Sequence, residues 1–500
     1  MDSPSVPVRS RYTPGSFAEL LSVAIPLIIS SGSVSLMHSI DRVFLSWYSQ
    51  EALAASMPAG LFNWLMMSLA YGTVLYVNTF VAQYHGAGRR DRVAASLWQG
   101  IYLATVFGLF LAAIAPFLSL LFARFGHDPK VQELEVTLFC FYSFGSPIIL
   151  INTALTSFYS GRGAVTVVMW SNICALFVNA ILDYLLIFGI EGVIPAYGVT
   201  GAAVATIAGY VASCAFMVLL INLAKGYNAY PFRQTFGFDR ELAGRMLRHG
   251  FPTGMQMFVD IVGIMAFLLV VGNMGTIPLV ASNLAFSLNS LTFIPLMGLG
   301  ITVTTLVGQR IGEKRPDLAE KTAWMTFGLA FLYMSVWITA YLAIPETLMY
   351  PYLLHATKDV PEIQAMTTIL LHYVCIYTFF DGCATIFGGA IRGAGDTHFP
   401  AVLTVITSIC LLLIPMLILG YYGTTLHIAW WVISIYIIVL GVSLLLRFLT
   451  GKWKHMTVME HSIIVAPAYD MESPAEHVAE LTMPLHAEDL SDEKQIAKMH

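Results

Sequence analysis

Long apolar segments recur along most of the chain, and short polar or charged stretches separate them. A helix needs about 20 apolar residues to cross a hydrocarbon layer about 30 Å thick. Twelve segments reach this length, and they are too continuous for the alternating strands of a membrane β-barrel. The pattern predicts an all-α integral membrane protein with transmembrane helices at 17–47, 53–84, 94–124, 135–160, 164–189, 197–224, 249–273, 279–311, 320–346, 361–391, 399–420 and 427–449.

The second half of the sequence repeats the first at an offset of 226. Pro26 aligns with Pro252, and the polar turn Gln-x-x-Gly-x-x-Arg-x-Asp at 83–91 aligns with the same pattern at 309–317. Apolar bias alone does not align a polar turn. Each half has six spans, so both halves start on the same side of the membrane. We therefore expect two six-helix lobes related by a pseudo-two-fold axis along the membrane normal, with a central cavity that opens to either side, as in a transporter.

Lysine and arginine are concentrated in alternate loops. One set of loops holds most of them, whereas the opposite set holds only Arg124, Lys130 and Lys358. Because cytoplasmic loops carry the excess of positive charge, both termini are predicted to be cytoplasmic. The expected organisation is a cytoplasmic N-terminus (1–16), an N-lobe (17–224), a cytoplasmic linker (225–248), a C-lobe (249–450) and a disordered cytoplasmic tail (451–500).

Composition supports a membrane protein and excludes some kinds of site. Only 11% of residues are charged, against about 25% in a typical soluble protein. The six cysteines lie singly in apolar spans without a C-x-x-C pair, so neither a disulfide framework nor a zinc site is expected. The net charge of −5 says little about partners, and no nucleic-acid partner is expected.

Four aspartates lie within predicted spans, where an ionisable residue is costly and indicates function. Asn179 and Asp183 are four residues apart and share a helix face, and Thr206 in the next span offers a hydroxyl. Asp41 would face them if the first, fifth and sixth spans line the lobe interior. Such oxygen atoms can share a proton or hold Na⁺, while a structural hydrogen-bond cluster is the alternative. Arg42 should not pair with Asp41, because adjacent helix positions point about 100° apart.

The second lobe carries its own acidic residues, Asp260 and Asp381, which form a second pair or the polar wall of an aqueous cavity. They do not repeat those of the first lobe, since Asp41 aligns with Phe267 and Asp260 with Val34. Five further side chains either line a substrate cavity or pack against helices and lipid: Tyr184, Met257, Tyr373, Tyr377 and Phe380.

The sequence argues against an energy source or catalytic centre of its own. It lacks the phosphate-binding motif GxxxxGK[ST] and the HExxH and GxSxG motifs, and His38 and His372 are isolated. A polytopic membrane enzyme is therefore disfavoured. A flippase for lipid-linked precursors would need a basic cavity, and few lysines or arginines lie within the spans.

Over residues 15–450 the chain resembles the multidrug and toxic compound extrusion (MATE) family of cation-coupled efflux transporters, of the bacterial NorM and DinF type. The matching segments are the run from Asp41 to Trp47, the segments 179–189 and 198–206, Gly250-Phe-Pro252 with Asp260, Val307–Gly312, and Asp381 with 392–396.

The resemblance implies a secondary antiporter in a bacterial inner membrane that exports small, often cationic, organic compounds in exchange for H⁺ or Na⁺, as a monomer without a cofactor. Asp41, Asn179, Asp183 and Thr206 match the first-lobe cation site of DinF-like members and some NorM-like members. Asp260 and Asp381 match the second-lobe acidic positions of NorM-like members, where many have Glu in place of Asp260. Because the first-lobe set is complete, it is the expected coupling site.

Overall fold

The computed structural model describes residues 12–124, 127–190, 192–223, 230–353 and 359–460. The chain divides into a large unit that ends at Val458 and a second unit, Met459–His500. All the described helices belong to the large unit. Apart from an isolated bridge between Ile190 and Ile194, the described residues form helices and turns, which confirms the all-α prediction.

Twelve helical segments of the described chain are long and apolar enough to span a membrane, as predicted. They are α1 (Phe17–Tyr48), α2 with α3 (Gln50–Leu75, Val77–Gly86), α4 with η1 (Arg90–Leu118, Ser119–Arg124), α5 (Pro129–Gly161), α6 (Val165–Phe188), α7 (Val199–Leu223), α8 (Arg240–Gly272), α9 (Thr276–Gly312), α10 (Pro316–Ala343), α12 (Val360–Ala394), α13 with η3 and α14 (His398–Thr407, Ser408–Leu413, Ile414–Tyr422) and α15 (Leu426–Leu449). The short helix α11 (Pro345–Leu353) follows α10, and the 3-10 turn η4 (Lys452–His455) follows α15.

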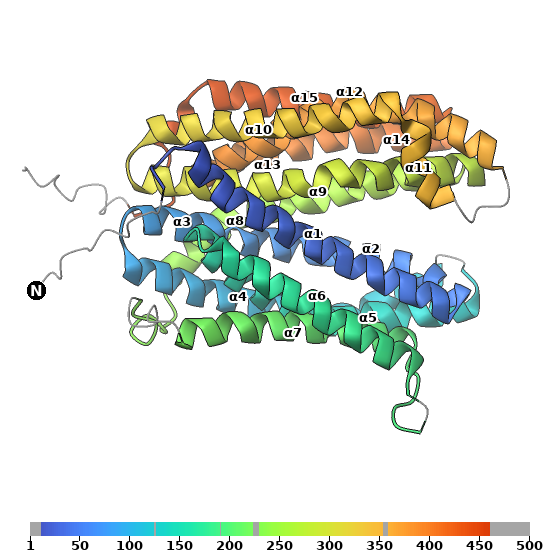
Figure 1. Cartoon of the computed structure of the whole chain (residues 1–500), viewed down its shortest axis with the longest axis horizontal. Helices are drawn as coiled ribbons and strands as arrows, with labels where there is room; N and C mark the ends of the chain where they lie inside the picture. The colour runs from blue at the N-terminus through green and yellow to red at the C-terminus, as the bar shows by residue number, and fades with distance from the viewer. Residues whose placement is uncertain (1–11, 125–126, 191, 224–229, 354–358, 461–500) are drawn as a thin grey trace, which may run out of the picture. The chain divides into compact units, whose positions relative to one another are not determined.

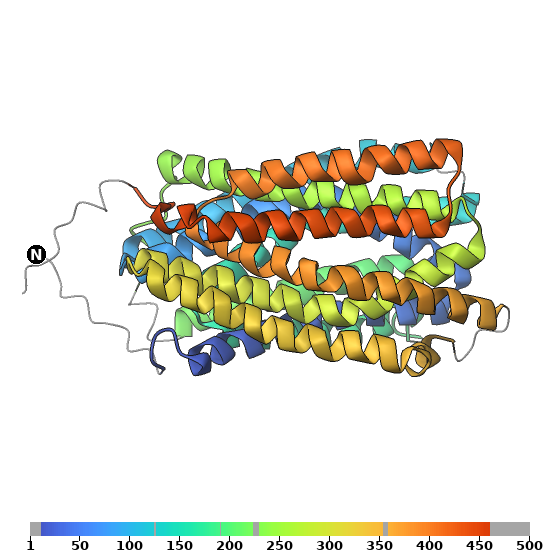
Figure 2. The ribbon, with the colours of Figure 1, turned by 90° about the horizontal axis from the view of Figure 1, so that it is seen from above.

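The helices of the large unit form two groups that match the two halves of the sequence. Figure 1 shows α9, α10, α12, α13, α14 and α15 together on one side and α4 to α7 on the other. Helix α1 crosses obliquely between the groups and packs on α6 of its own half and on α9 of the other. In the view of Figure 2 the helices again run along a common direction. The arrangement agrees with the predicted pair of six-helix lobes.

Helix α8 starts within the segment that the sequence assigned to the linker. Asp239 caps the helix by accepting a hydrogen bond from Leu242 N at 3.0 Å. Burial opposes the charge, but the bonds from Leu242 N and Arg92 hold the pKa of Asp239 below its ordinary value. The buried residues Leu242 and Met246 then anchor the first turns. The helix therefore begins about two and a half turns before the predicted start at residue 249, because arginines on the exposed side mask the apolar face.

The repeated polar turn joins the lobes through reciprocal hydrogen bonds. Gln83 Nε2 in α3 donates to the carbonyl of Gly393 at 2.9 Å, and Gln309 Nε2 in α9 donates to the carbonyl of Gly161 at 2.8 Å. Each glutamine thus binds the end of a helix in the opposite half. The repeat detected in the sequence corresponds to a symmetric contact at the predicted cytoplasmic ends of the helices.

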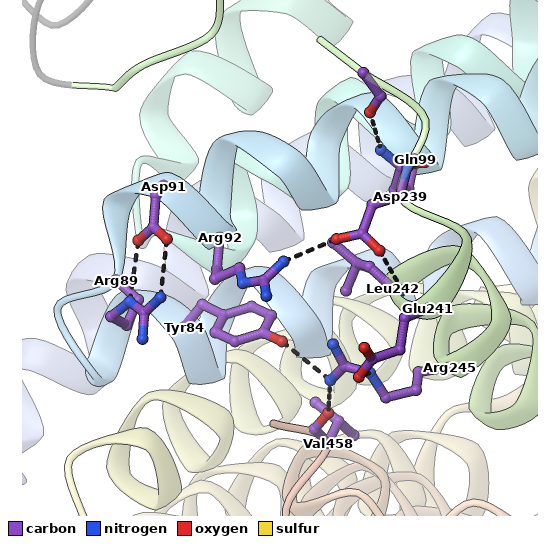
Figure 3. Close-up of polar contacts among 11 residues, drawn as sticks. Tyr84, Arg89, Asp91, Arg92, Gln99, Asp239, Glu241, Leu242, Arg245 and Val458 are labelled. Carbon is purple, nitrogen blue, oxygen red and sulfur yellow. Dashed lines mark hydrogen bonds and ion pairs between the residues drawn. The ribbon is translucent and has the colours of Figure 1, made fainter. Parts of the chain in front are cut away.

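A second pair of repeat-related contacts lies beside the first and differs between the lobes. Arg310 of α9 is almost fully buried and pairs with Glu19 of α1 and with Glu313, whose oxygen lies 2.7 Å from Arg310 Nη1. At the offset of 226, Glu19 corresponds to Arg245 and Arg310 to Tyr84. Those residues also meet, since Arg245 Nη1 donates to the Tyr84 hydroxyl at 3.1 Å (Figure 3). One lobe-to-lobe contact is a buried ion pair and its counterpart is a hydrogen bond.

Glu19→Gln is expected to destabilise the protein, because it leaves Arg310 buried with only half of its counter-charge. Breaking a buried ion pair costs about 3–5 kcal/mol, and Glu313 limits the loss to the lower part of that range. Thermal unfolding of the purified protein measures the effect. Glu241→Gln is the matched control, because the Glu241 side chain is largely exposed and lies 3.8 Å from Arg245, so this ion pair should contribute little. Equal melting temperatures for the two variants would contradict the role of the buried pair.

The chain beyond α15 remains folded through Val458. Trp453 of η4 is fully buried and stacks on the last turn of α15. Val458 N donates to Gln83 Oε1 at 2.9 Å, and the Val458 carbonyl accepts from Arg245 Nη1 at 2.8 Å, as Figure 3 shows for the second bond. The tail predicted from residue 451 is therefore wrong for its first eight residues, which tie α15 to α3 and α8. Its remainder lies largely outside the described residues.

Candidate functional site

Three helices of the first lobe converge on the carboxylate of Asp41. Asn179 Nδ2 of α6 donates to Asp41 Oδ1 at 2.9 Å, and Thr206 Oγ1 of α7 donates to Asp41 Oδ2 at 3.2 Å. All three side chains are buried. The structure thus brings together Asp41, Asn179 and Thr206 as the sequence predicted, from positions up to 165 residues apart.

Asp183 lies one helical turn after Asn179 and is fully buried beside the same carboxylate. Its two oxygens, and Oδ1 of Asn179, have no hydrogen-bond donor among the described residues. A buried acceptor without a partner costs about 1–3 kcal/mol, and a charged one costs more. Asp183 also lies close to Asp41, so the two carboxyls could share one proton. The unsatisfied oxygens point to a proton or cation as their partner.

The atoms at this site suit a proton or a small hard cation. The site offers oxygen ligands, which hard cations prefer. They are two carboxylates, the carbonyl oxygen of Asn179 and the hydroxyl of Thr206. Within the described ranges no group of three or more His, Cys, Asp or Glu residues could hold a metal ion. The oxygen atoms of the first-lobe cluster could hold a proton or a small hard cation.

Sequence reasoning missed two neighbours of this cluster. His38 was taken as isolated, but its Nδ1 lies 3.6 Å from Asp41 Oδ2, and its side chain is about half exposed. The spacing of three residues on one helix was the available signal. Tyr142 of α5 approaches Thr206 and the two carboxyls, and no spacing in the sequence indicated this. Arg42 is exposed and makes no ion pair with Asp41, as expected.

The second-lobe aspartates are placed differently. Asp260 of α8 accepts a 2.5 Å hydrogen bond from the hydroxyl of Tyr436 in α15. Asp381 of α12 is half-buried and lies within electrostatic range of Asp260, but within the described chain it has no hydrogen bond or ion pair. The two aspartates are neighbours without the direct contacts that define the first-lobe cluster.

The five predicted cavity residues separate into two kinds. Tyr373 and Tyr377 are buried in the hydrophobic core of the second lobe, which agrees with the alternative that they pack against helices. Tyr184 is exposed and packs on Phe44 and Phe188, while Met257 and Phe380 are half-buried. The Met257 sulfur would lie 2.9 Å from a Cβ placed on Gly72, so Met257 sits where α8 meets α2 of the other lobe.

Twelve spans in two repeated lobes, with carboxyl groups buried at membrane depth, define a membrane transporter assembled from two halves. The model of the MatE family matches residues 26–185 and 252–419, one match in each lobe. The chain belongs to the MatE family. This membership places it among transporters rather than enzymes, as predicted from the sequence.

Related proteins and solved structures agree with this assignment. A probable multidrug resistance protein NorM of Thermotoga maritima is 27% identical over 88% of this chain and 94% of its own. A probable multidrug resistance protein NorM of Agrobacterium fabrum is 26% identical over 78% and 84%. A structure described as the outward-facing conformation of a multidrug resistance MATE family transporter superposes with a TM-score of 0.78 at 19% identity, over 88% of this chain and 96% of that chain. The last match supports the fold alone.

Proposed function

We propose that the protein is a secondary antiporter that exports small, often cationic, organic compounds in exchange for H⁺ or Na⁺. It would work as a monomer in a bacterial inner membrane, with both termini in the cytoplasm, without a cofactor or nucleic-acid partner. The relatives named as multidrug resistance proteins support the substrate class. The observation that carries the proposal is the buried first-lobe cluster, in which Asp183 has no donor among the described residues and Asp41 joins three helices.

The first-lobe cluster can pass a change in its charge to the other lobe through α1. Near its outer end α1 is held to α6 and α7 by the bonds to Asp41, and at its first turn Glu19 pairs with Arg310 of α9. Pro26 lies between these points and interrupts the helical hydrogen-bond ladder. An ion that neutralises the carboxyl pair weakens its hold on the amide and hydroxyl donors, so the outer part of α1 can move relative to its anchored start.

The membrane potential supplies enough energy for this exchange. A potential of 100 mV contributes about 2.3 kcal/mol per charge moved across the membrane. About 1.4 kcal/mol corresponds to a tenfold ratio of substrate concentrations across the membrane. One net charge moved inward per cycle therefore sustains a substrate gradient of roughly fortyfold.

Transport in proteoliposomes tests the proposal. Wild-type protein should drive a cationic dye against its gradient when a pH gradient or a Na⁺ gradient is imposed, and the effective gradient identifies the coupling ion. Asp41→Asn should remove the response to that gradient, because the amide can carry neither a proton nor the charge that a cation needs. Asp91→Asn is the comparison variant and should keep the gradient response, because that carboxylate is about half exposed and pairs with Arg89 away from the buried cluster. A full response in Asp41→Asn would exclude the first-lobe cluster as the coupling site.

A further inference from the structure

Asp260 is held by one tyrosine from the last span of its lobe. The Tyr436 hydroxyl donates to Asp260 Oδ1 at 2.5 Å, a short distance that is typical of an O–H group bonded to a carboxylate. The Tyr436 side chain is nearly buried, whereas Asp260 is half-buried. The tyrosine thus fixes the carboxylate while leaving part of it accessible.

The eleventh span carries an irregular turn at this point. Residues Ser408–Leu413 form a π-helix, and such turns occur frequently at functional sites. The turn packs against α8 at Gly263, where an added Cβ would lie 2.5 Å from Leu412. Ser408 Oγ donates to the Val259 carbonyl at 3.4 Å and lies close to the Tyr436 hydroxyl. The π-helix therefore places a second hydroxyl beside the tyrosine that holds Asp260.

The position of Asp260 on its helix leaves it at the boundary between the lobes. One side of α8, at Gly263, packs on the π-helix of the second lobe, and another side, at Ile261 and Met265, packs on the hydrophobic cluster of the first lobe. Asp381 adds a second carboxyl nearby that has no polar partner in the described chain. Arg392 is within electrostatic range of Asp260 but is hydrogen-bonded to Gln256 at 3.4 Å. The local carboxylates are thus only partly compensated.

The last span of the first lobe also contains a tyrosine, which does not perform the same task. Tyr210 lies about as far into α7 (Val199–Leu223) as Tyr436 lies into α15 (Leu426–Leu449), and it is electrostatically close to Asp41. Both oxygens of Asp41 accept instead from Asn179 and Thr206. Both last spans carry a tyrosine, but only in the second lobe is its hydroxyl the hydrogen-bond donor to the aspartate.

We propose that Tyr436 is a positioning residue that holds Asp260 so that it, together with Asp381, receives the charged group of a monovalent organic cation. This role rests on the proposed function and divides the work between the lobes. The first-lobe carboxyls exchange the driving ion, and the second-lobe carboxyls bind the exported cation. The apolar body of the substrate is not assigned to particular side chains.

Binding and transport of ethidium by Tyr436→Phe test this role, because the substitution removes only the hydroxyl. The Kd for ethidium, measured by fluorescence anisotropy on the purified full-length protein, should rise about tenfold or more. In proteoliposomes the KM for ethidium should rise similarly while the maximal rate and the ion requirement stay unchanged. A purely structural role would lower the amount of active protein and the melting temperature without a selective change in KM.

Two further variants make the outcome decisive. Tyr210→Phe, the control in the last span of the first lobe, should leave the Kd unchanged. The double variant Tyr436→Phe with Asp260→Asn should bind no more weakly than Asp260→Asn alone, because the tyrosine acts through that carboxyl. An unchanged Kd in Tyr436→Phe, or additive losses in the double variant, would overturn the proposal. If Tyr436→Phe raised the Kd but the wild type showed no ion-driven transport, the result would contradict the antiport mechanism and not the role of Tyr436.

Discussion

Asp183→Asn is expected to abolish ion-driven efflux while leaving the protein at least as stable as the wild type. The substitution keeps the size of the side chain and removes a carboxylate whose two oxygens lack a donor among the described residues. Uncoupled protein cannot sustain the roughly fortyfold gradient that one charge supports, so the accumulation ratio should fall toward one. Removing an uncompensated buried charge should raise the melting temperature or leave it unchanged.

Efflux of a cationic dye and thermal unfolding, measured on the same preparation, separate a functional role from a structural one. Asp91→Asn is the control, because that carboxylate is about half exposed and pairs with Arg89 in the polar turn between α3 and α4. It should transport like the wild type. If Asp183→Asn kept its gradient, or if it lost activity only in proportion to a lower melting temperature, the assignment of Asp183 to the coupling site would be wrong.

Gly86→Ala and Gly312→Ala are each expected to prevent closure of the lobes at their predicted cytoplasmic ends. A Cβ on Gly86 would lie 2.1 Å from the carbonyl oxygen of Gln309, and one on Gly312 would lie 2.1 Å from the carbonyl oxygen of Gln83. Both obstacles are backbone atoms within helices, which cannot rotate away as a side chain can. Because the clash lies between the lobes, each lobe should still fold. Efflux should fall by about tenfold or more, because a clash that destabilises the closed state by about 1.4 kcal/mol already lowers its population tenfold.

The reactivity of a cysteine placed at Asn78 reports this closure directly. Asn78 is buried between the lobes, where its Nδ2 lies 3.1 Å from Thr305 Oγ1. In a cysteine-free background, a membrane-impermeant maleimide applied to the cytoplasmic side should label Asn78→Cys faster when Gly86 or Gly312 carries a methyl group. Gly328→Ala is the matched control, because no atom lies within 4 Å of the added Cβ. Unchanged labelling in both interface variants would show that the glycines do not limit the approach of the lobes.

The sequence was most informative where a short-range rule or the internal repeat applied. The spacing of Asn179 and Asp183 placed them on one face of α6, and the apolar pattern predicted twelve spans that the structure confirms. The aligned turn at 83–91 and 309–317 indicated a shared feature. Its reciprocal hydrogen bonds across the lobes needed coordinates, because an alignment does not show which carbonyl a glutamine reaches.

The sequence was least informative where two residues of different type, one from each half of the chain, contact each other. Glu19 and Arg310 lie 291 residues apart, and neither position carries the same residue in the other half. Tyr436 was not singled out, since a tyrosine in an apolar span is ordinarily explained by packing. In both cases the partner is chosen by the packing of helices that are distant in sequence, which spacing within one helix cannot reveal.

The contacts made by the two ends of the large unit also bear on how a chain with an internal repeat can evolve. Helix α1 of the first half packs on α9 of the second, and Val458, at the end of the second half, binds α3 of the first. The halves thus resemble two subunits of a symmetric dimer, each with an arm laid across the other. In a dimer of identical subunits every substitution appears in both copies. Covalent fusion removes that constraint, so Glu19 could face Arg310 in one half while Arg245 faces Tyr84 in the other.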